Sequence, residues 1–172
     1  MRGTVLYLLD ANVLIDANRD YYPLERVPEF WEWLIEAGKK GIVKIPIEVY
    51  EEIKEGNDDD ILAIWAKQGH VHDALLLNEE PQVSTVSNVV DQGYAFDLTD
   101  DEVEKIGRDP FLIAYALVEP LGRCIVTTEV SKPNKTRANR KLPDVCDQLN
   151  VLHCNTYEFI RSLDFKTKWK SA

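Results

Sequence analysis

The chain has 172 residues, which is enough for one domain with a substantial core. Hydrophobic residues make up 45% and charged residues 29% of it, values that exclude a disordered chain and fit a globular one. Its formal net charge of −10 would repel a nucleic-acid backbone, so such a partner requires a local basic patch or metal ions.

The sequence also indicates the compartment. It has no long apolar run and no basic-then-apolar start, so we expect neither a transmembrane helix nor a signal peptide. The three cysteines lie in apolar segments and have no close-spaced pair, so we expect reduced, buried thiols and no cysteine zinc site. Together these features predict a cytoplasmic protein.

Short apolar runs rich in branched and aromatic residues predict four buried strands, at 5–9, 42–45, 123–127 and 151–154. A weaker candidate is 70–72, where two histidines would share one face of a strand. Helical patterns with proline, glycine or capping residues at their ends fall between the strands, at 12–18, 28–37, 46–55, 61–69, 83–92, 99–107, 110–118, 143–150 and 155–163.

This alternation of strands and helices predicts the α/β class, as a three-layer α/β/α sandwich with a central parallel sheet of four to five strands. We expect a single domain over residues 1–163, followed by a frayed basic tail at 164–172.

Acidic residues follow or accompany several of these elements. Asp10 comes directly after the first strand and Glu129 shortly after the third, while Asp109 precedes a wholly apolar helix and Glu52 lies on the helix after the second strand. Right-handed crossovers bring the carboxyl ends of parallel strands to one edge, where open α/β sheets bind ligands. We therefore expect these carboxylates to converge.

Asp10 and Asp109 also have purely structural interpretations. Asp10 and Asn12 would serve as turn or N-cap residues, and Asp109 followed by Pro110 would be a helix cap. Glu48, Glu51 and Glu55 are expected to form a solvated acidic face of the same helix as Glu52.

Converging carboxylates repel one another, and a hard cation such as Mg²⁺ or Mn²⁺ removes the conflict. Such ions activate water and hold the oxygens of a phosphodiester, so the pattern favours phosphoryl-transfer chemistry. A basic segment in this acidic chain would supply the phosphate contacts, through Lys132, Lys135, Arg137, Arg140 and Lys141. The alternative for this segment is a solvated loop or a surface that docks an acidic protein.

Four segments resemble the motifs of the PIN-domain family. Residues 9–15, LDANVLI, are similar to its Asp-x-Asn-x-Leu-Ile opening, and residues 49–53, VYEEI, to the second motif, in which Glu52 is the matching acid. Residues 109–116, DPFLIAYA, resemble the third motif, and residues 126–129, VTTE, resemble the fourth with a glutamate in place of the usual Asp or Asn.

The resemblance implies a metal-dependent endoribonuclease, often the toxin of a toxin–antitoxin pair, that commonly dimerises and is silenced by a small antitoxin protein. It implies Asp10, Glu52 and Asp109 as catalytic ligands of Mg²⁺ or Mn²⁺, with Glu129 or Asp144 as the outer acid. Asn12 would orient Asp10, and Thr127 would support the strand end through a hydrogen bond.

Two other functions stay open. One is a catalytically silent PIN-like module that binds protein or RNA. The other is a phosphatase with an aspartate nucleophile, which is less favoured because such enzymes usually carry a second Asp where this chain has Asn12.

Overall fold

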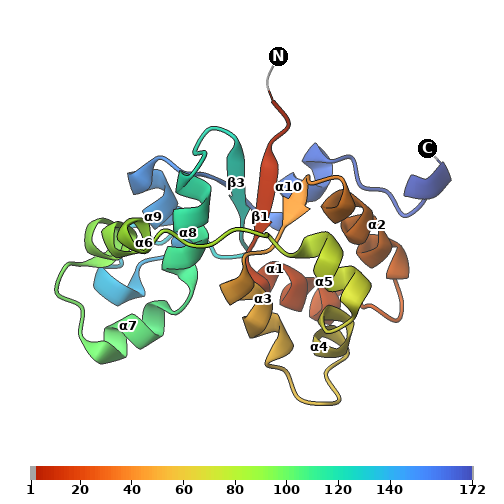
Figure 1. Cartoon of the computed structure of the whole chain (residues 1–172), viewed down its shortest axis with the longest axis horizontal. Coiled ribbons are helices and arrows are strands. Elements are labelled where there is room, and N and C mark those ends of the chain that lie inside the picture. The colour runs from red at the N-terminus through yellow and green to blue at the C-terminus, as the bar shows by residue number, and fades with distance from the viewer. Residues whose placement is uncertain (1–2, 172) are drawn as a thin grey trace.

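The structure, a computed structural model, describes residues 3–171 as an α/β fold around an all-parallel four-stranded sheet (Figure 1). The strand order is β2-β1-β3-β4. The strands are β1 (Leu6–Leu9), β2 (Val43–Lys44), β3 (Arg123–Val126) and β4 (Leu152–Cys154). Each lies within or at one of the four predicted runs, and the predicted three-layer α/β/α sandwich is confirmed.

The strands place their carboxyl ends at one edge of the sheet. Leu9 of β1 pairs with Val126 of β3, and Val126 pairs with Cys154 of β4. Beyond the ladder, the Asp10 amide donates to the carbonyl of Val126 at 3.0 Å, and the Thr127 amide donates to that of Cys154 at 3.1 Å. The chain therefore leaves β1 and β3 side by side, which brings their flanking polar residues together.

Ten α-helices flank the sheet, with α6 to α9 on the left and α2 to α5 on the right in Figure 1. They are α1 (Ala11–Asp16), α2 (Pro28–Lys39), α3 (Ile47–Lys54), α4 (Ile61–Ala66), α5 (Gly69–Leu75), α6 (Val83–Val89), α7 (Asp100–Ile106), α8 (Asp109–Leu117), α9 (Leu142–Leu149) and α10 (Thr156–Ser162). Two π-helical turns, η1 (Ala17–Tyr21) and η2 (Val90–Tyr94), extend α1 and α6, and 3₁₀ turns form η3 (Arg137–Asn139) and η4 (Trp169–Ser171).

The core lies between the sheet and these helices. Large side chains such as Trp31, Tyr50, Tyr115 and Phe159 are almost fully buried. Helix α8 is buried on nearly all sides, as its uniformly apolar sequence predicts. Cys124 and Cys146 are buried, Cys154 is half-buried, and all three are free thiols.

Two predictions about elements are wrong. Residues 70–72 do not form a strand but lie in α5, where Val71, Ala74 and Leu75 share one buried face at helical spacing. The tail from 164 is not frayed over its described part: Phe165 packs against Trp33, and the Trp169 indole donates to the Glu29 carbonyl at 3.1 Å. The sequence prediction overlooked how much aromatic surface these tail residues can bury.

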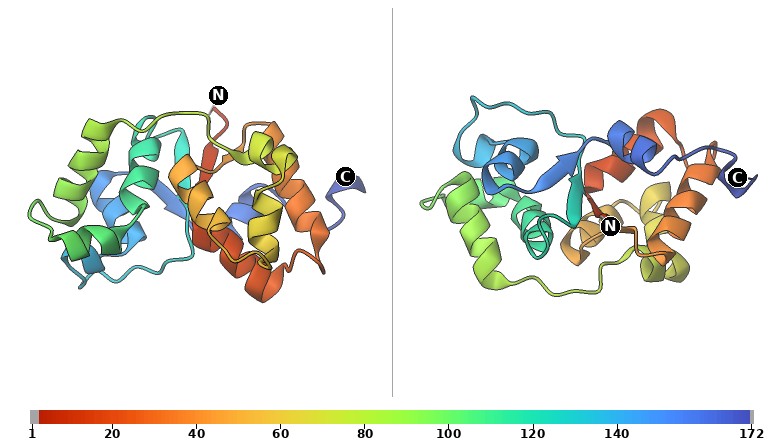
Figure 2. Two further views of the ribbon diagram at one scale, coloured as in Figure 1. Left: turned by 60° about the horizontal axis from the view of Figure 1, so that its bottom comes forward. Right: turned by 90° about the horizontal axis from the view of Figure 1, so that it is seen from above.

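Within residues 3–171, the helices are all too short or too polar to cross a bilayer. Both views of Figure 2 show the connection from β3 to α9 as a long loop on the outside of the molecule. This loop contains the predicted basic segment and passes over the carboxyl edge of the sheet.

Candidate functional site

Asp10 occupies the centre of this edge and is 7% exposed. It stands at the N-cap position of α1, yet its carboxylate makes no capping hydrogen bond. Instead, Oδ2 accepts a hydrogen bond of 2.9 Å from the hydroxyl of Thr127, which is itself 1% exposed. Burial, reinforced by Glu129 and Glu52, raises the pKa of Asp10 to about 6. Asp10 therefore occupies the predicted N-cap position, but its side chain does not cap α1.

Asp109 is the second carboxylate of the site and is half-buried. It is the first residue of α8 and not its cap, and its side chain makes no capping hydrogen bond. Within residues 3–171 it has no hydrogen-bonded or ion-paired partner. Burial raises its pKa well above the usual range, and Asp10, Glu129 and Glu52 raise it further. Helix capping thus does not explain this residue, which faces three other carboxylates.

Glu129 and Glu52 form the outer part of the cluster and already have partners. Glu129 Oε2 accepts from the first amide of α9, that of Leu142, at 2.7 Å, and Lys141 Nζ lies 3.7 Å from its other oxygen. Glu52 on α3 is partly exposed and lies 3.7 Å from Arg108, which also pairs with Glu55 at 2.6 Å. Two side-chain cations therefore partly neutralise the outer acids.

Two predicted site residues lie elsewhere. Asp144 binds the hydroxyl of Ser131 and the amide of Lys132, so it fixes the start of the basic loop and is not among the groups that shift Asp10 or Asp109. Asn12 is exposed and makes no hydrogen bond to Asp10 in the described chain, because α1 buries its neighbours Ala11 and Val13. Thr127 supplies the support expected of Asn12.

The basic loop divides into two kinds of residue. Arg137 pairs with Glu102 and Asp97, each at 2.7 Å, and lowers the pKa of Glu102 to about 2. Arg140 binds the carbonyls of Gly93 and Asp144 and the side chain of Gln148. Both arginines thus anchor the loop to the protein, and their role as phosphate contacts stays a prediction.

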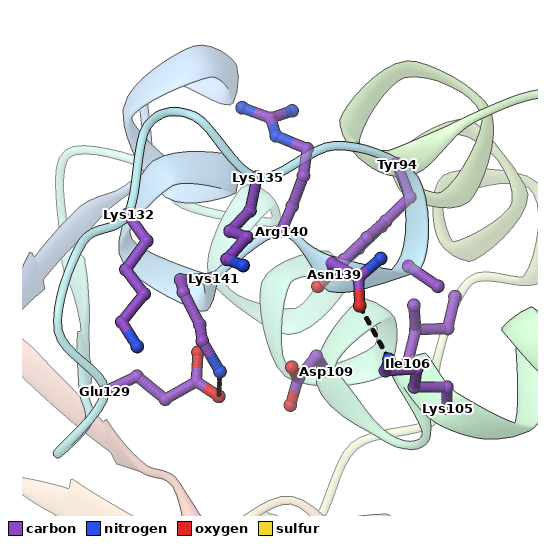
Figure 3. Close-up of a pocket in the computed structure, with 11 residues that line it drawn as sticks. Tyr94, Lys105, Ile106, Asp109, Glu129, Lys132, Lys135, Asn139, Arg140 and Lys141 are labelled. Atoms are coloured by element: carbon purple, nitrogen blue, oxygen red, sulfur yellow. Dashed lines mark hydrogen bonds and ion pairs between the residues drawn. The ribbon is translucent and has the colours of Figure 1, made fainter.

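The lysines of this loop are arranged differently. Lys132, Lys135 and Lys141 line a pocket of about 300 Å³ whose floor contains Asp109 and Glu129. In Figure 3 their ammonium groups point toward these two acids, whereas the guanidinium group of Arg140 points away. The lysines can therefore contact an anion bound beside the carboxylates.

Three polar residues of this pocket were not predicted as site residues. Lys105 on α7 donates to the side-chain oxygen of Asn139 at 2.6 Å across the pocket. Tyr94 on η2 is 7% exposed, and its hydroxyl has no hydrogen-bond partner. Burial raises the pKa of Tyr94, with Asp109 adding to the shift, so the hydroxyl stays protonated. Nothing in the periodicity around these residues indicates that they face a pocket.

Asp10 and Asp109 offer oxygen atoms of the kind that Mg²⁺ and Mn²⁺ prefer, and Asp109 has no competing protein partner. Among residues 3–171, however, no three His, Cys, Asp or Glu side chains are close enough to hold a metal ion as they stand. Glu129 and Glu52 are instead paired with Lys141 and Arg108. The inner acids fit a divalent cation, and the outer ones need to exchange partners to join it.

Comparison with known proteins gives a match to one family model. No curated protein and no solved structure matches the chain. A family model described as Domain of unknown function (DUF4411) matches residues 7–167, a range that includes most of β1, the candidate site and the first four residues of the tail. The chain therefore belongs to the DUF4411 family.

Proposed function

We propose that this protein is a PIN-like, metal-dependent endoribonuclease that hydrolyses RNA phosphodiester bonds. The observation that carries the proposal is the pair Asp10 and Asp109, one buried and one half-buried carboxyl group, whose pKa values are both raised by burial and by neighbouring acids. Perturbed carboxylates in a pocket favour a functional site over a structural one. The family description names no activity, so the proposal rests on this pair and on the resemblance of the motifs.

Asp10 and Asp109 would hold Mg²⁺ or Mn²⁺, with Glu129 and Glu52 completing the acidic set. When bound, such a cation would polarise the phosphodiester and promote its hydrolysis by water. The Thr127 hydroxyl fixes one oxygen of Asp10 at 2.9 Å, which leaves the other oxygen to face the ligand. The protein thus contributes a rigid inner pair and two glutamates able to adjust.

The lysines of the pocket would bring RNA to these acids. Lys132, Lys135 and Lys141 line the same pocket as Asp109, so they would bind phosphate oxygens directly beside it. Lys141 would have to leave Glu129 to do so, which would free that glutamate at the same time. Such contacts depend on backbone charge and carry no base sequence.

The resemblance extends the proposal to a cytoplasmic toxin that forms a homodimer and is silenced by a small antitoxin protein. Such an antitoxin would cover the acidic pocket. An adjoining short gene for a DNA-binding protein, together with relief of growth arrest on co-expression, would support this role. Growth unaffected by expression of the protein alone would count against it.

The second candidate is a PIN-like module that binds RNA or protein without catalysis. The ion pairs of Glu129 with Lys141 and of Glu52 with Arg108 favour it, because they use two of the four acids for structure. The capping of α9 by Glu129 points the same way. This candidate predicts RNA or partner binding that is insensitive to neutralising Asp10.

The test is cleavage of a panel of RNAs, with Mg²⁺ or Mn²⁺ and with a chelator, by the wild-type protein and by Asp10→Asn and Asp109→Asn. Asp164→Asn is a matched control on the exposed tail. We expect metal-dependent cleavage by the wild type and the control only. Equal cleavage by all four proteins would refute the site, and RNA binding without any cleavage would favour the second candidate.

A further inference from the structure

The pocket beside Asp109 contains a buried hydroxyl that the protein does not satisfy. Tyr94 is 93% buried, and none of the described residues accepts or donates a hydrogen bond at its hydroxyl oxygen. Figure 3 shows this side chain reaching from η2 toward Asn139 and Asp109. Leaving a buried hydroxyl unpaired is unfavourable, so the position of Tyr94 indicates a ligand atom that completes the bond.

The charge around this hydroxyl selects an anion. Four lysines line the pocket, Lys105, Lys132, Lys135 and Lys141, against the two acids Asp109 and Glu129. One acid, Glu129, is already paired with Lys141. In a protein of net charge −10, a pocket with this surplus of ammonium groups is a local positive site.

Three of the lysines, Lys105, Lys132 and Lys135, remain able to bind a ligand as they stand. Lys135 is exposed and makes no side-chain hydrogen bond in the described chain. Lys105 uses one of its three donors on Asn139, which fixes the ammonium group in place and leaves two donors for a ligand. Asn139 thereby acts as a brace between α7 and the basic loop.

We propose that this pocket binds a phosphate group, with the Tyr94 hydroxyl, Lys105 and Lys135 donating to the phosphate oxygens. At about 300 Å³ the pocket has room for a phosphate with part of a nucleoside attached. The inference deepens the proposed function, because this phosphate would belong to a nucleotide next to the bond that is cut. Phosphate binding itself, however, requires neither metal nor cleavage.

The test is calorimetric titration of inorganic phosphate and of adenosine monophosphate into the metal-free protein, in chelator and at low salt. We expect both to bind and adenosine not to bind. A hydrogen bond to a charged group is worth enough that Tyr94→Phe should weaken binding about tenfold, and Lys135→Met should weaken it severalfold. Tyr157→Phe and Lys39→Met, on exposed surfaces of α10 and α2, are matched controls that should bind as the wild type does.

Wild-type protein that binds no phosphate at millimolar concentration would overturn the inference, as would equal binding by wild type, Tyr94→Phe and Lys135→Met. If Tyr94→Phe fails to fold, Lys105→Met and Lys135→Met decide the question on their own. A protein that binds phosphate but never cleaves RNA would retain this pocket and lose the proposed activity. The two conclusions therefore fail separately.

Discussion

The inner acids of the candidate site, Asp10 and Asp109, and its outer acids, Glu52 and Glu129, differ in whether a nearby cation compensates their charge. Asp10 is buried, Asp109 is half-buried, and neither forms an ion pair within the described chain, so burial and the neighbouring acids make their anionic forms unfavourable. Glu52 and Glu129 lie farther out and are each accompanied by a cation, Arg108 or Lys141. A fold that keeps the inner pair uncompensated retains an unfavourable arrangement that a bound cation would relieve.

Neutralising the inner pair should have the largest effect. Asp109→Asn is expected to reduce RNA cleavage by roughly 100-fold or more, because metal assistance is worth several kcal/mol. The same variant should unfold at a higher temperature than the metal-free wild type, since it removes a carboxyl group whose ionisation the site makes unfavourable. Cleavage rates and thermal unfolding measured on one preparation test both effects. An inactive Asp109→Asn that is also less stable would point to a structural role.

The inner pair also predicts how stability depends on pH. Burial raises the pKa of Asp10 to about 6, so the folded state holds this proton more tightly than the unfolded state does. The resulting stabilisation is complete below the unfolded pKa and is lost as the pH rises through about 6. Between pH 5 and pH 7.5 Asp10 alone should cost roughly 1 kcal/mol of unfolding free energy. Asp109 acts in the same direction.

Urea unfolding of the metal-free protein at these two pH values measures the effect. Asp10→Asn should show a smaller loss of stability over the same interval. A wild-type protein that gains stability from pH 5 to pH 7.5, or a variant with the same loss, would contradict the account of Asp10.

The outer acids should respond differently. Lys141→Met removes a cation from beside Glu129, so the Kd for Mn²⁺ should fall by about two- to fivefold, the range expected for a partly exposed ion pair. RNA binding by the same variant should weaken, with the salt dependence reduced by about one unit of slope. Calorimetry and a salt series of RNA binding measure the two. Weaker Mn²⁺ binding would show that Lys141 supports the acids rather than competing with metal.

The smallest effects should separate the anchoring arginines from the pocket lysines. Arg137→Met breaks pairs with Glu102 and Asp97 and should lower stability only slightly, with little change in the salt dependence of RNA binding. Lys135→Met should instead leave stability unchanged and reduce the salt dependence of RNA binding. Denaturant unfolding and RNA titrations distinguish them, and equal loss of RNA binding in both variants would contradict the division of the loop.

The strands and the convergence of the four acids could be predicted from sequence, because they depend on local patterns and on the handedness of crossovers. The hydrogen-bonding role of Thr127 could also be predicted, from its position at the end of β3. Asn12 was misassigned because the burial of Ala11 and Val13 turns its side chain outward, and that rotation depends on how α1 packs.

Other features depend on residues that are distant in the chain. Arg137 forms ion pairs with Asp97 and Glu102, which are 40 and 35 positions away in the chain. The basic segment alone therefore could not predict these pairs. Tyr94 lies in a π-helical turn, where no regular spacing reveals which way a side chain points. Which charged residues form ion pairs within the protein, and which face the pocket, could therefore be known only from the folded structure.

The central claim is that Asp10 and Asp109 form the inner part of a metal site. Calorimetric titration of Mn²⁺ into the wild type, Asp109→Asn and the matched control Asp164→Asn tests it most directly. We predict that Mn²⁺ binds the wild type and the control alike and that binding is lost in Asp109→Asn. Equal Mn²⁺ binding by all three proteins, or none by the wild type, would contradict the claim.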